Sequence, residues 1–166
     1  MNFSESENRS CPEKTGLVRK LVDNKFNEKY PPTLGIEYST YICKINDETI
    51  KIMLWDTSGD KNFEQISKAY ITNAVGGIVT FSLTDCQTFE ETVSWITLLR
   101  KTGAPNVKIV LVGTKSDLIN DRQVTESEAQ TFAETQGIPY FETSAKTDTN
   151  VQKAFHSLFD EVLKEM

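Results

Sequence analysis

Three short polar stretches of this chain combine residue types that can bind phosphate, a metal ion and an aromatic ring. They are Asp56-Thr57-Ser58-Gly59, Thr114-Lys115-Ser116-Asp117 and Glu142-Thr143-Ser144-Ala145-Lys146. Each follows an apolar run, at 50–55, 107–113 and 138–141 respectively. Such runs are typical of strands buried on both faces, and doubly wound sheets bind ligands where the carboxyl ends of their strands open. We therefore expect the three stretches to share one site.

The chemistry of these stretches suits a nucleotide. Asp56 offers a carboxylate that can hold a hydrated Mg²⁺ through water, and Gly59 offers a backbone N–H that an anion can approach because glycine has no Cβ. The carboxylate of Asp117 could accept two donors from the edge of a planar ring, with the stem of Lys115 lying over that ring. Ordinary surface turns after core strands would explain the stretch at Asp56 or the stretch at Thr114 taken alone. They explain the presence of both stretches less well.

Strands and helices that could position these residues alternate along the chain. Strands are expected at 38–45 and 49–55, joined as a hairpin, and at 76–83, 107–113 and 138–141. Helices are expected at about 15–24, 63–73, 89–103 and 125–137, and from 151 onward. Thr125 and Glu128 form a capping box, and the only histidine, His156, is expected on the solvated surface. The pattern predicts an α/β fold with a doubly wound, mostly parallel sheet and one antiparallel edge hairpin.

Composition places the chain among single-domain globular proteins. It has 166 residues, of which 38% are hydrophobic and 25% charged, with no apolar run long enough to span a membrane and no apolar segment near Met1 that could be a secretory signal. Its three cysteines are far apart, which favours reduced thiols and an intracellular, cytoplasmic or complex-associated protein. A net charge of −6 argues against a general nucleic-acid binder.

The polar stretches also resemble the motifs of small GTPases of the Rab branch of the Ras superfamily. WDTSG resembles that family's WDTAG, VGTKSDL resembles its guanine-reading VGNKxDL, and ETSAK matches its last motif. The similarity runs from Lys14 to the C-terminus. It implies a Ras-type P-loop NTPase fold, a domain at 14–166, and GTP or GDP with Mg²⁺ as cofactors.

The resemblance assigns roles to individual residues. Nucleotide would contact Lys14, Thr15, Thr33, Gly59, Thr114, Lys115, Asp117, Ser144, Ala145 and Lys146. Mg²⁺ would be held by Thr15, Thr33 and Asp56. Thr114 replaces the family's usual asparagine, a variant that Rho-type members tolerate.

The phosphate loop departs from the family pattern. The family has G-x-x-x-x-G-K-[ST], whereas this chain has Asn8-Arg9-Ser10-Cys11-Pro12-Glu13-Lys14-Thr15, so both glycines are missing. Pro12 lacks an N–H donor, and Glu13 adds a negative charge where the polyphosphate would lie. Losing two or three charge-assisted hydrogen bonds is expected to weaken binding by roughly 3–9 kcal/mol. Alternatively, Glu13 turns outward and the loop deforms around the phosphates.

The segment before Lys14 departs as well. Residues 1–13 are expected to be an irregular segment that replaces the family's first strand and most of its phosphate loop, because MNFSESE is too short and too polar for an interior strand. A protein partner could supply the strand by β-augmentation or hold the N-terminal segment. A truncated gene model or a splice variant would explain the same features.

Two further departures bear on activity. Asp60 occupies the position of the family's water-orienting glutamine, so slow or absent hydrolysis is expected and no catalytic residue is assigned. The sequence stops at Lys164-Glu165-Met166 without prenylation cysteines, which indicates either no lipid anchor or a removed tail.

Two hypotheses follow. The first is a degenerate Rab-like pseudo-GTPase, with weak or absent GTP binding and hydrolysis, that serves as a protein-binding module or a subunit of a larger complex. The alternative is a functional Rab-type GTP switch with slow hydrolysis.

Overall fold

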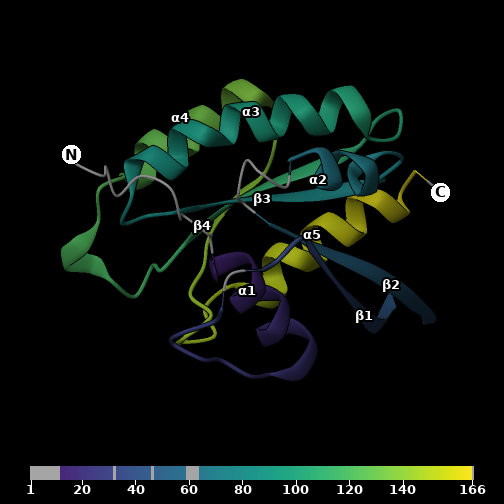
Figure 1. Ribbon diagram of the computed structural model, residues 1–166, viewed down its shortest axis with the longest axis horizontal. Helices are drawn as coiled ribbons and strands as arrows, with labels where there is room; N and C mark the ends of the chain where they lie inside the picture. Colours follow the sequence, from purple (N-terminus) through teal and green to yellow (C-terminus); the bar gives the residue numbers. More distant parts are fainter. Residues whose placement is uncertain (1–11, 32, 46, 59–63, 166) are drawn as a thin grey trace, which may run out of the picture.

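After an initial helix and a two-stranded hairpin, the fold alternates helices and strands. The computed structural model describes residues 12–31, 33–45, 47–58 and 64–165 (Figure 1). The elements are α1 (Pro12–Asp23), β1 (Ile36–Ile45), β2 (Glu48–Thr57), α2 (Glu64–Ile71), β3 (Gly76–Ser82), α3 (Cys86–Thr102), β4 (Lys108–Thr114), the 3₁₀ turn η2 (Ile119–Asp121), α4 (Glu126–Gln136), β5 (Tyr140–Glu142) and α5 (Val151–Leu163). None of the described helices is both long and apolar enough to cross a membrane.

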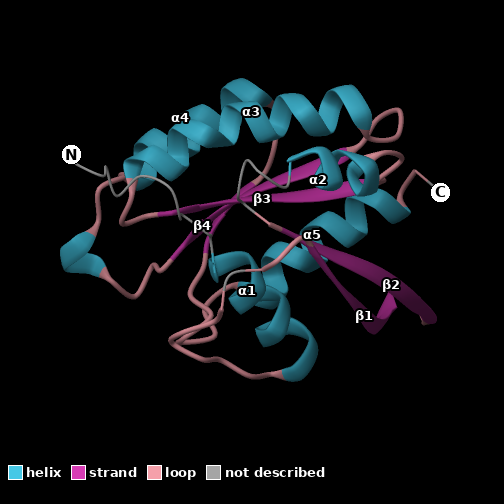
Figure 2. Cartoon of the chain, viewed as in Figure 1, coloured by secondary structure: helices cyan, strands magenta, loops and turns pink. Residues whose placement is uncertain are grey.

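The strands form two sheets. β3, β4 and β5 pair in parallel, and β1 pairs with β2 as an antiparallel hairpin whose register runs from Ile36 opposite Thr57 to Ile45 opposite Glu48. Helices α3 and α4 lie on one side of the parallel sheet, and α1 and α5 lie on the other (Figure 2). The predicted α/β class, with a parallel sheet and an antiparallel hairpin, is confirmed.

Two apolar cores lie on opposite faces of the parallel sheet. One packs Phe81 and Leu111 against α3 and α4, and the other packs Val110 and Val112 against α1 and α5. On β4, Leu111 faces one core, and Val110 and Val112 face the other, because successive side chains of a strand point to opposite sides. The central strand is therefore buried on both faces, as its continuous apolar run predicts.

Local sequence signals place several element ends. The capping box is present at Thr125 and Glu128, and Gly137 ends α4 in the left-handed region at φ 65°. The first helix begins at Pro12, three residues before the expected position, so Glu13 lies in its first turn. Proline is well tolerated at the start of a helix because its missing N–H would have no intrahelical partner there.

The expected surface position of His156 is wrong. Its side chain is half-buried, with its ring edge-on to Tyr41 at 6.2 Å between centroids and a further contact to Phe159. The Tyr41 hydroxyl lies 3.4 Å from His156 Nε2. The hairpin covers this side of α5, which a helical stripe alone does not reveal.

In the described part of the chain, β2 and β3 are not hydrogen-bonded to each other. A cavity of about 430 Å³ is lined by five consecutive residues of β2, at 53–57, and by β3 residues 76–80. We call this cavity, with the two strand edges that border it, the interstrand groove. It lies directly beside the end of β2 that bears Asp56.

Candidate functional site

The three predicted metal ligands meet at the start of α1. The hydroxyl of Thr15 donates to Asp56 Oδ2 at 2.5 Å, and Thr33 Oγ1 lies 2.9 Å from Thr15 Oγ1 and 3.4 Å from Asp56 Oδ2. All three side chains are buried. They come from α1, from the loop that precedes β1, and from the end of β2, so the tertiary fold brings together residues up to 41 positions apart.

Asp56 is the most polar member of this cluster and the least satisfied. Its Oδ1 atom is buried and has no hydrogen-bond partner. Burial raises the pKa of this carboxyl group, while the hydrogen bond from Thr15 and the charge of Lys14 act in the opposite direction. A carboxylate and two hydroxyls form an all-oxygen donor set of the kind Mg²⁺ prefers, and the unpartnered Oδ1 is a vacant acceptor beside it. The residues therefore fit a magnesium ion.

The expected Mg²⁺ ligands include more hydroxyl groups than carboxylates. Among the described residues, no group of three or more His, Cys, Asp or Glu side chains could hold a metal. A cation at Asp56 would therefore meet only one carboxylate from the chain, and such sites usually rely on substrate phosphates and water for the remaining ligands.

The predicted ring-binding residues occupy the neighbouring loops. Ser144 donates its hydroxyl to Asp117 Oδ1 at 2.6 Å, and the Ser116 N–H donates to the Thr143 carbonyl at 3.1 Å. These bonds join the loop after β4 to the loop after β5. The buried Thr114 hydroxyl donates to the Phe81 carbonyl at 2.9 Å, so it points into the sheet.

Two of the three lysines predicted to contact the nucleotide, Lys115 and Lys14, have partners close to the start of α1 or on α3. Lys115 Nζ lies 2.6 Å from Glu13 Oε1, and Lys115 adopts the left-handed conformation at φ 62°. Lys14 Nζ lies 5.5 Å from the ring centroid of Trp95 on α3, a cation–π contact. Lys14, which is expected to bind phosphate, is thus turned toward Trp95. Lys115, which is expected to lie over the ring, is turned toward Glu13.

The remaining predicted residues lie at the rim or outside the described part. Lys146 forms an exposed ion pair with Glu28 at 2.9 Å. Ala145 packs near Gly16 of α1, where an added Cβ would lie 3.9 Å from Ala145 Cβ. Gly59, Asp60 and most of the sequence that corresponds to the phosphate loop lie outside the described residues.

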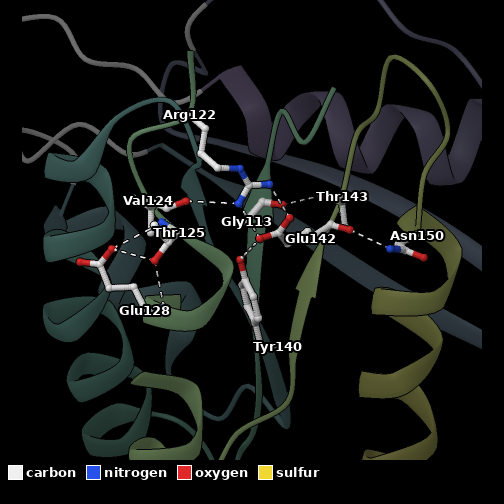
Figure 3. A network of polar contacts seen from close by, with 9 residues as sticks. All are labelled: Gly113, Arg122, Val124, Thr125, Glu128, Tyr140, Glu142, Thr143 and Asn150. Carbon is white, nitrogen blue, oxygen red and sulfur yellow. Dashed lines mark hydrogen bonds and ion pairs between the residues drawn. The ribbon is translucent and has the colours of Figure 1, made fainter. Parts of the chain in front are cut away.

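A partly buried polar network supports the loops after β4 and β5, and the sequence reasoning missed it. Arg122 donates to both carboxylate oxygens of Glu142, at 2.8 and 2.6 Å, and the Tyr140 hydroxyl donates to Glu142 Oε1 at 3.0 Å (Figure 3). Asn150 donates to the Glu142 carbonyl at 2.9 Å. The network fixes the residue that directly precedes Thr143 and Ser144.

The pKa values in this network reflect its geometry. The Arg122 hydrogen bonds hold the pKa of Glu142 below its ordinary value, against the effect of burial. Burial and the nearby Glu142 carboxylate raise the pKa of Tyr140, so the phenol stays protonated as a donor. Glu142 was visible in the ETSAK motif, but nothing in the sequence indicated Arg122 as its partner.

An aromatic patch on the hairpin was also missed. Tyr38 on β1, Trp55 on β2 and Tyr70 on α2 have successive ring centroids 5.0 Å apart. Their exposed fractions are 49%, 43% and 47%, and Met53 beside them is 56% exposed. We call these four residues the aromatic patch. Clustered aromatic and methionine side chains at a protein surface are typical of protein–protein contacts.

The sequence of this chain is similar to a known protein family. The Ras family model matches residues 9–164. The chain is 40% identical over 153 residues to the Ras-related protein Rab-2B of Dictyostelium discoideum, covering 92% of this chain and 76% of that one. It is 36% identical to RABA2d of Arabidopsis thaliana and 37% identical to YPTC6 of Chlamydomonas reinhardtii, each over 149 residues, 90% of this chain and 69% of the relative.

Proposed function

Since the chain belongs to the Ras family of small GTPases and is similar throughout to Rab-type members, we propose that it is a degenerate Rab-like GTPase. In this proposal it binds GTP weakly or not at all, hydrolyses it slowly or not at all, and serves as a protein-binding module or a subunit of a larger complex. The observation on which the proposal rests is the ion pair between Glu13 and Lys115.

Glu13 places a negative charge where an anionic ligand would otherwise be favoured. The N-terminus of a helix attracts anions through its free N–H groups and its dipole. Glu13 lies in the first turn of α1, is only 13% exposed, and reaches Lys115 at 2.6 Å. A polyphosphate would have to displace this ion pair and then lie beside the Glu13 carboxylate. Both steps weaken nucleotide binding.

The residues expected to hold Mg²⁺ keep the family's residue types better than the phosphate loop does. Thr15, Thr33 and Asp56 would hold the ion. When bound, Mg²⁺ would neutralise charge on nucleotide phosphates. The hydroxyls of Thr15 and Thr33 orient the Asp56 carboxylate, and burial keeps bulk water away from it. The expected Mg²⁺ site favours the alternative, a working switch with slow hydrolysis, because its ligand residues are assembled.

Protein binding has its own support. The aromatic patch exposes three aromatic rings, tilted against one another, and a methionine on the hairpin side of the molecule. A partner could also hold the N-terminal segment or add a strand. We place this activity inside the cell, since Cys43 and Cys86 are free thiols.

The decisive test is the nucleotide content of the purified protein. Denaturing it and chromatographing the supernatant should release little or no GDP or GTP. Stoichiometric nucleotide would overturn the pseudo-GTPase proposal in favour of the working switch.

A matched pair of variants tests the role assigned to Glu13. Glu13→Gln removes the charge at the start of α1, and Asp23→Asn removes one charge from the last turn of the same helix. Two like charges about 4 Å apart near a protein surface repel by about 1–4 kcal/mol, so Glu13→Gln should tighten binding of Mg²⁺-GTP by about fivefold or more. Asp23→Asn should leave it unchanged. Equal effects of the two variants would refute the role of Glu13.

A further inference from the structure

The interstrand groove is bordered by two strand edges that lack strand partners in the described part of the chain. β2 pairs only with β1 and β3 only with β4 among these residues. The carboxyl end of β2 contacts α1 through Asp56 and Thr15, and the loop after β4 contacts α1 through Lys115 and Glu13. Since β3 is parallel to β4, both edges of the groove run toward the start of α1.

The backbone groups that face the groove can be identified from the hydrogen bonds on the opposite edges. Leu83 N–H donates to the Thr114 carbonyl and Lys108 N–H donates to the Val75 carbonyl, so odd-numbered residues of β3 face β4. The alternation of a strand then turns the N–H and C=O groups of Ile78 and Thr80 toward the groove.

The same reasoning applies to β2. Ser58 N–H donates to the Gly35 carbonyl on the β1 side. Trp55 and Thr57 therefore present their backbone groups to the groove. Two rows of backbone donors and acceptors thus face the same cavity, and such groups need a partner when they are buried.

The groove is apolar on both faces of the sheet. Leu17 of α1 and Leu158 of α5 line it on one side, and Trp95 and Leu99 of α3 line it on the other. An occupant would therefore be covered on both faces. A strand in that environment is a continuous apolar run rich in β-branched residues, and not an alternating one.

We propose that the interstrand groove binds an apolar extended segment of a partner protein, which joins the two sheets into one. The segment would place about five residues, roughly 16 Å of strand, between β2 and β3. A small apolar ligand would leave the facing backbone groups without hydrogen bonds. The chain's own first eleven residues include only Met1 and Phe3 as large apolar side chains, so they lack the required run. This inference rests on the proposed protein-binding role and not on the loss of nucleotide binding.

The test uses a peptide probe with the required pattern. Strand β4, KIVLVGT, is the chain's own example of a strand buried on both faces. An acetylated and amidated KIVLVGTKK peptide is added to the full chain, and tryptophan fluorescence is followed. Both tryptophans of the chain, Trp55 and Trp95, line the groove, so binding should give a saturable change with one site per chain.

A matched peptide distinguishes strand pairing through backbone hydrogen bonds from nonspecific hydrophobic binding. The same peptide with N-methylated backbone amides keeps its side chains but loses its donors, so it should bind at least about tenfold more weakly. Hydrogen exchange should show new protection at the amides of Ile78, Thr80, Trp55 and Thr57, and none at β1. Equal binding of the two peptides, or no new protection at these amides, would overturn the proposal.

Other occupants give different results. Protection of these amides in the free chain at every concentration would assign the groove to the chain's own N-terminal residues. Protection that appears only as concentration rises would assign it to a second copy, and either result refutes the partner strand. If the free chain is insoluble, it is refolded with the unmodified or the N-methylated peptide, and the two yields of soluble protein are compared. Equal yields would refute the proposal. Nucleotide content is measured on the same sample, so failure here is distinct from failure of the pseudo-GTPase proposal.

Discussion

Asp56 illustrates at the scale of one residue how a site and the stability of the fold can conflict. Its carboxylate is buried, one oxygen lacks a partner, and burial raises its pKa. A group whose folded-state pKa is raised binds more protons in the folded state. Its charged form therefore lowers stability as pH rises above the ordinary value of 3.8. A bound cation would remove this cost.

The first prediction is that Asp56→Asn stabilises the metal-free protein at pH 7. The amide keeps an acceptor for Thr15 without the buried charge, so the free energy of unfolding should rise on the order of 1 kcal/mol. The gain should shrink as pH falls through the raised pKa of Asp56 toward the ordinary value of 3.8, because the carboxyl group of the folded protein becomes protonated over that range. Urea unfolding at pH 7 and at pH 4 measures both values. A loss of stability of equal size at the two pH values would contradict the assignment.

At the scale of elements, the network of Arg122, Tyr140 and Glu142 is what holds the loops after β4 and β5. It links the segment after η2 to β5, and the Asn150 bond extends it to the start of α5. The exposed fractions of the Arg122 and Glu142 side chains are 26% and 18%, so their ion pair is shielded from water. Shielded, bidentate pairs of this kind contribute more than exposed ones.

The second prediction concerns this pair. Glu142→Gln should lower the free energy of unfolding by about 1.5–3 kcal/mol at pH 7, because a charged hydrogen-bonded partner is lost. Since the pKa of Glu142 is lowered in the folded state, its contribution is present above the ordinary value of 4.5 and disappears as pH falls through the lowered value. The difference between wild type and variant should therefore narrow at acid pH in chemical unfolding experiments.

An exposed ion pair provides the control. Lys146→Met breaks the pair between Lys146 and Glu28, whose side chains are 52% and 72% exposed. It should change stability far less than Glu142→Gln does, because water screens the exposed charges. If Lys146→Met costs as much as Glu142→Gln, shielding is not the reason for the strength of the Arg122 pair.

At the scale of the whole molecule, ligand binding separates the two functional hypotheses by magnitude. A ligand that binds only the folded state stabilises it by RT ln(1 + [L]/Kd). A switch with a Kd of about 1 nM would gain on the order of 8 kcal/mol at about 1 mM Mg²⁺-GTP, whereas a Kd of about 1 mM gives about 0.4 kcal/mol.

The third prediction is that protein stripped of nucleotide shows only the small gain. The melting temperature should rise by about a degree or two with Mg²⁺-GTP, compared with about 15 °C or more for a tight switch. Scanning fluorimetry with Mg²⁺-ATP as the control makes the comparison. A rise specific to GTP of more than about 8 °C would favour the working switch.

The fourth prediction follows from the two separate sheets. With the backbone groups of β2 and β3 facing the groove, the isolated chain should associate, precipitate or melt without a cooperative transition. Size-exclusion chromatography with light scattering, followed by calorimetry, measures this. A sharp monomer peak with a two-state melt would indicate that the isolated chain needs no added strand.

The order and type of the elements could be predicted from the sequence alone. Apolar runs predicted the strands, and the capping box of Thr125 and Glu128 predicted the start of α4. The resemblance to the family's motifs implied that Thr15, Thr33 and Asp56 share one site. The apolar runs and the capping box are local signals, so they can be read without coordinates. That the ends of parallel strands meet at one edge follows from the common direction of those strands. In the structure the hydroxyl of Thr15 lies 2.5 Å from Asp56 Oδ2, and the role of the two residues in binding Mg²⁺ stays a prediction.

Which side chains contact one another is visible only in three dimensions. Glu13 pairs with Lys115 and Arg122 with Glu142, Lys14 lies over Trp95, and His156 packs against Tyr41. Each partner lies on another element or loop, and sequence spacing carries no information about which surface of one faces which surface of the other. The same holds for the interstrand groove, because a strand's outer edge shows its lack of a partner only when the neighbouring strands are placed in space.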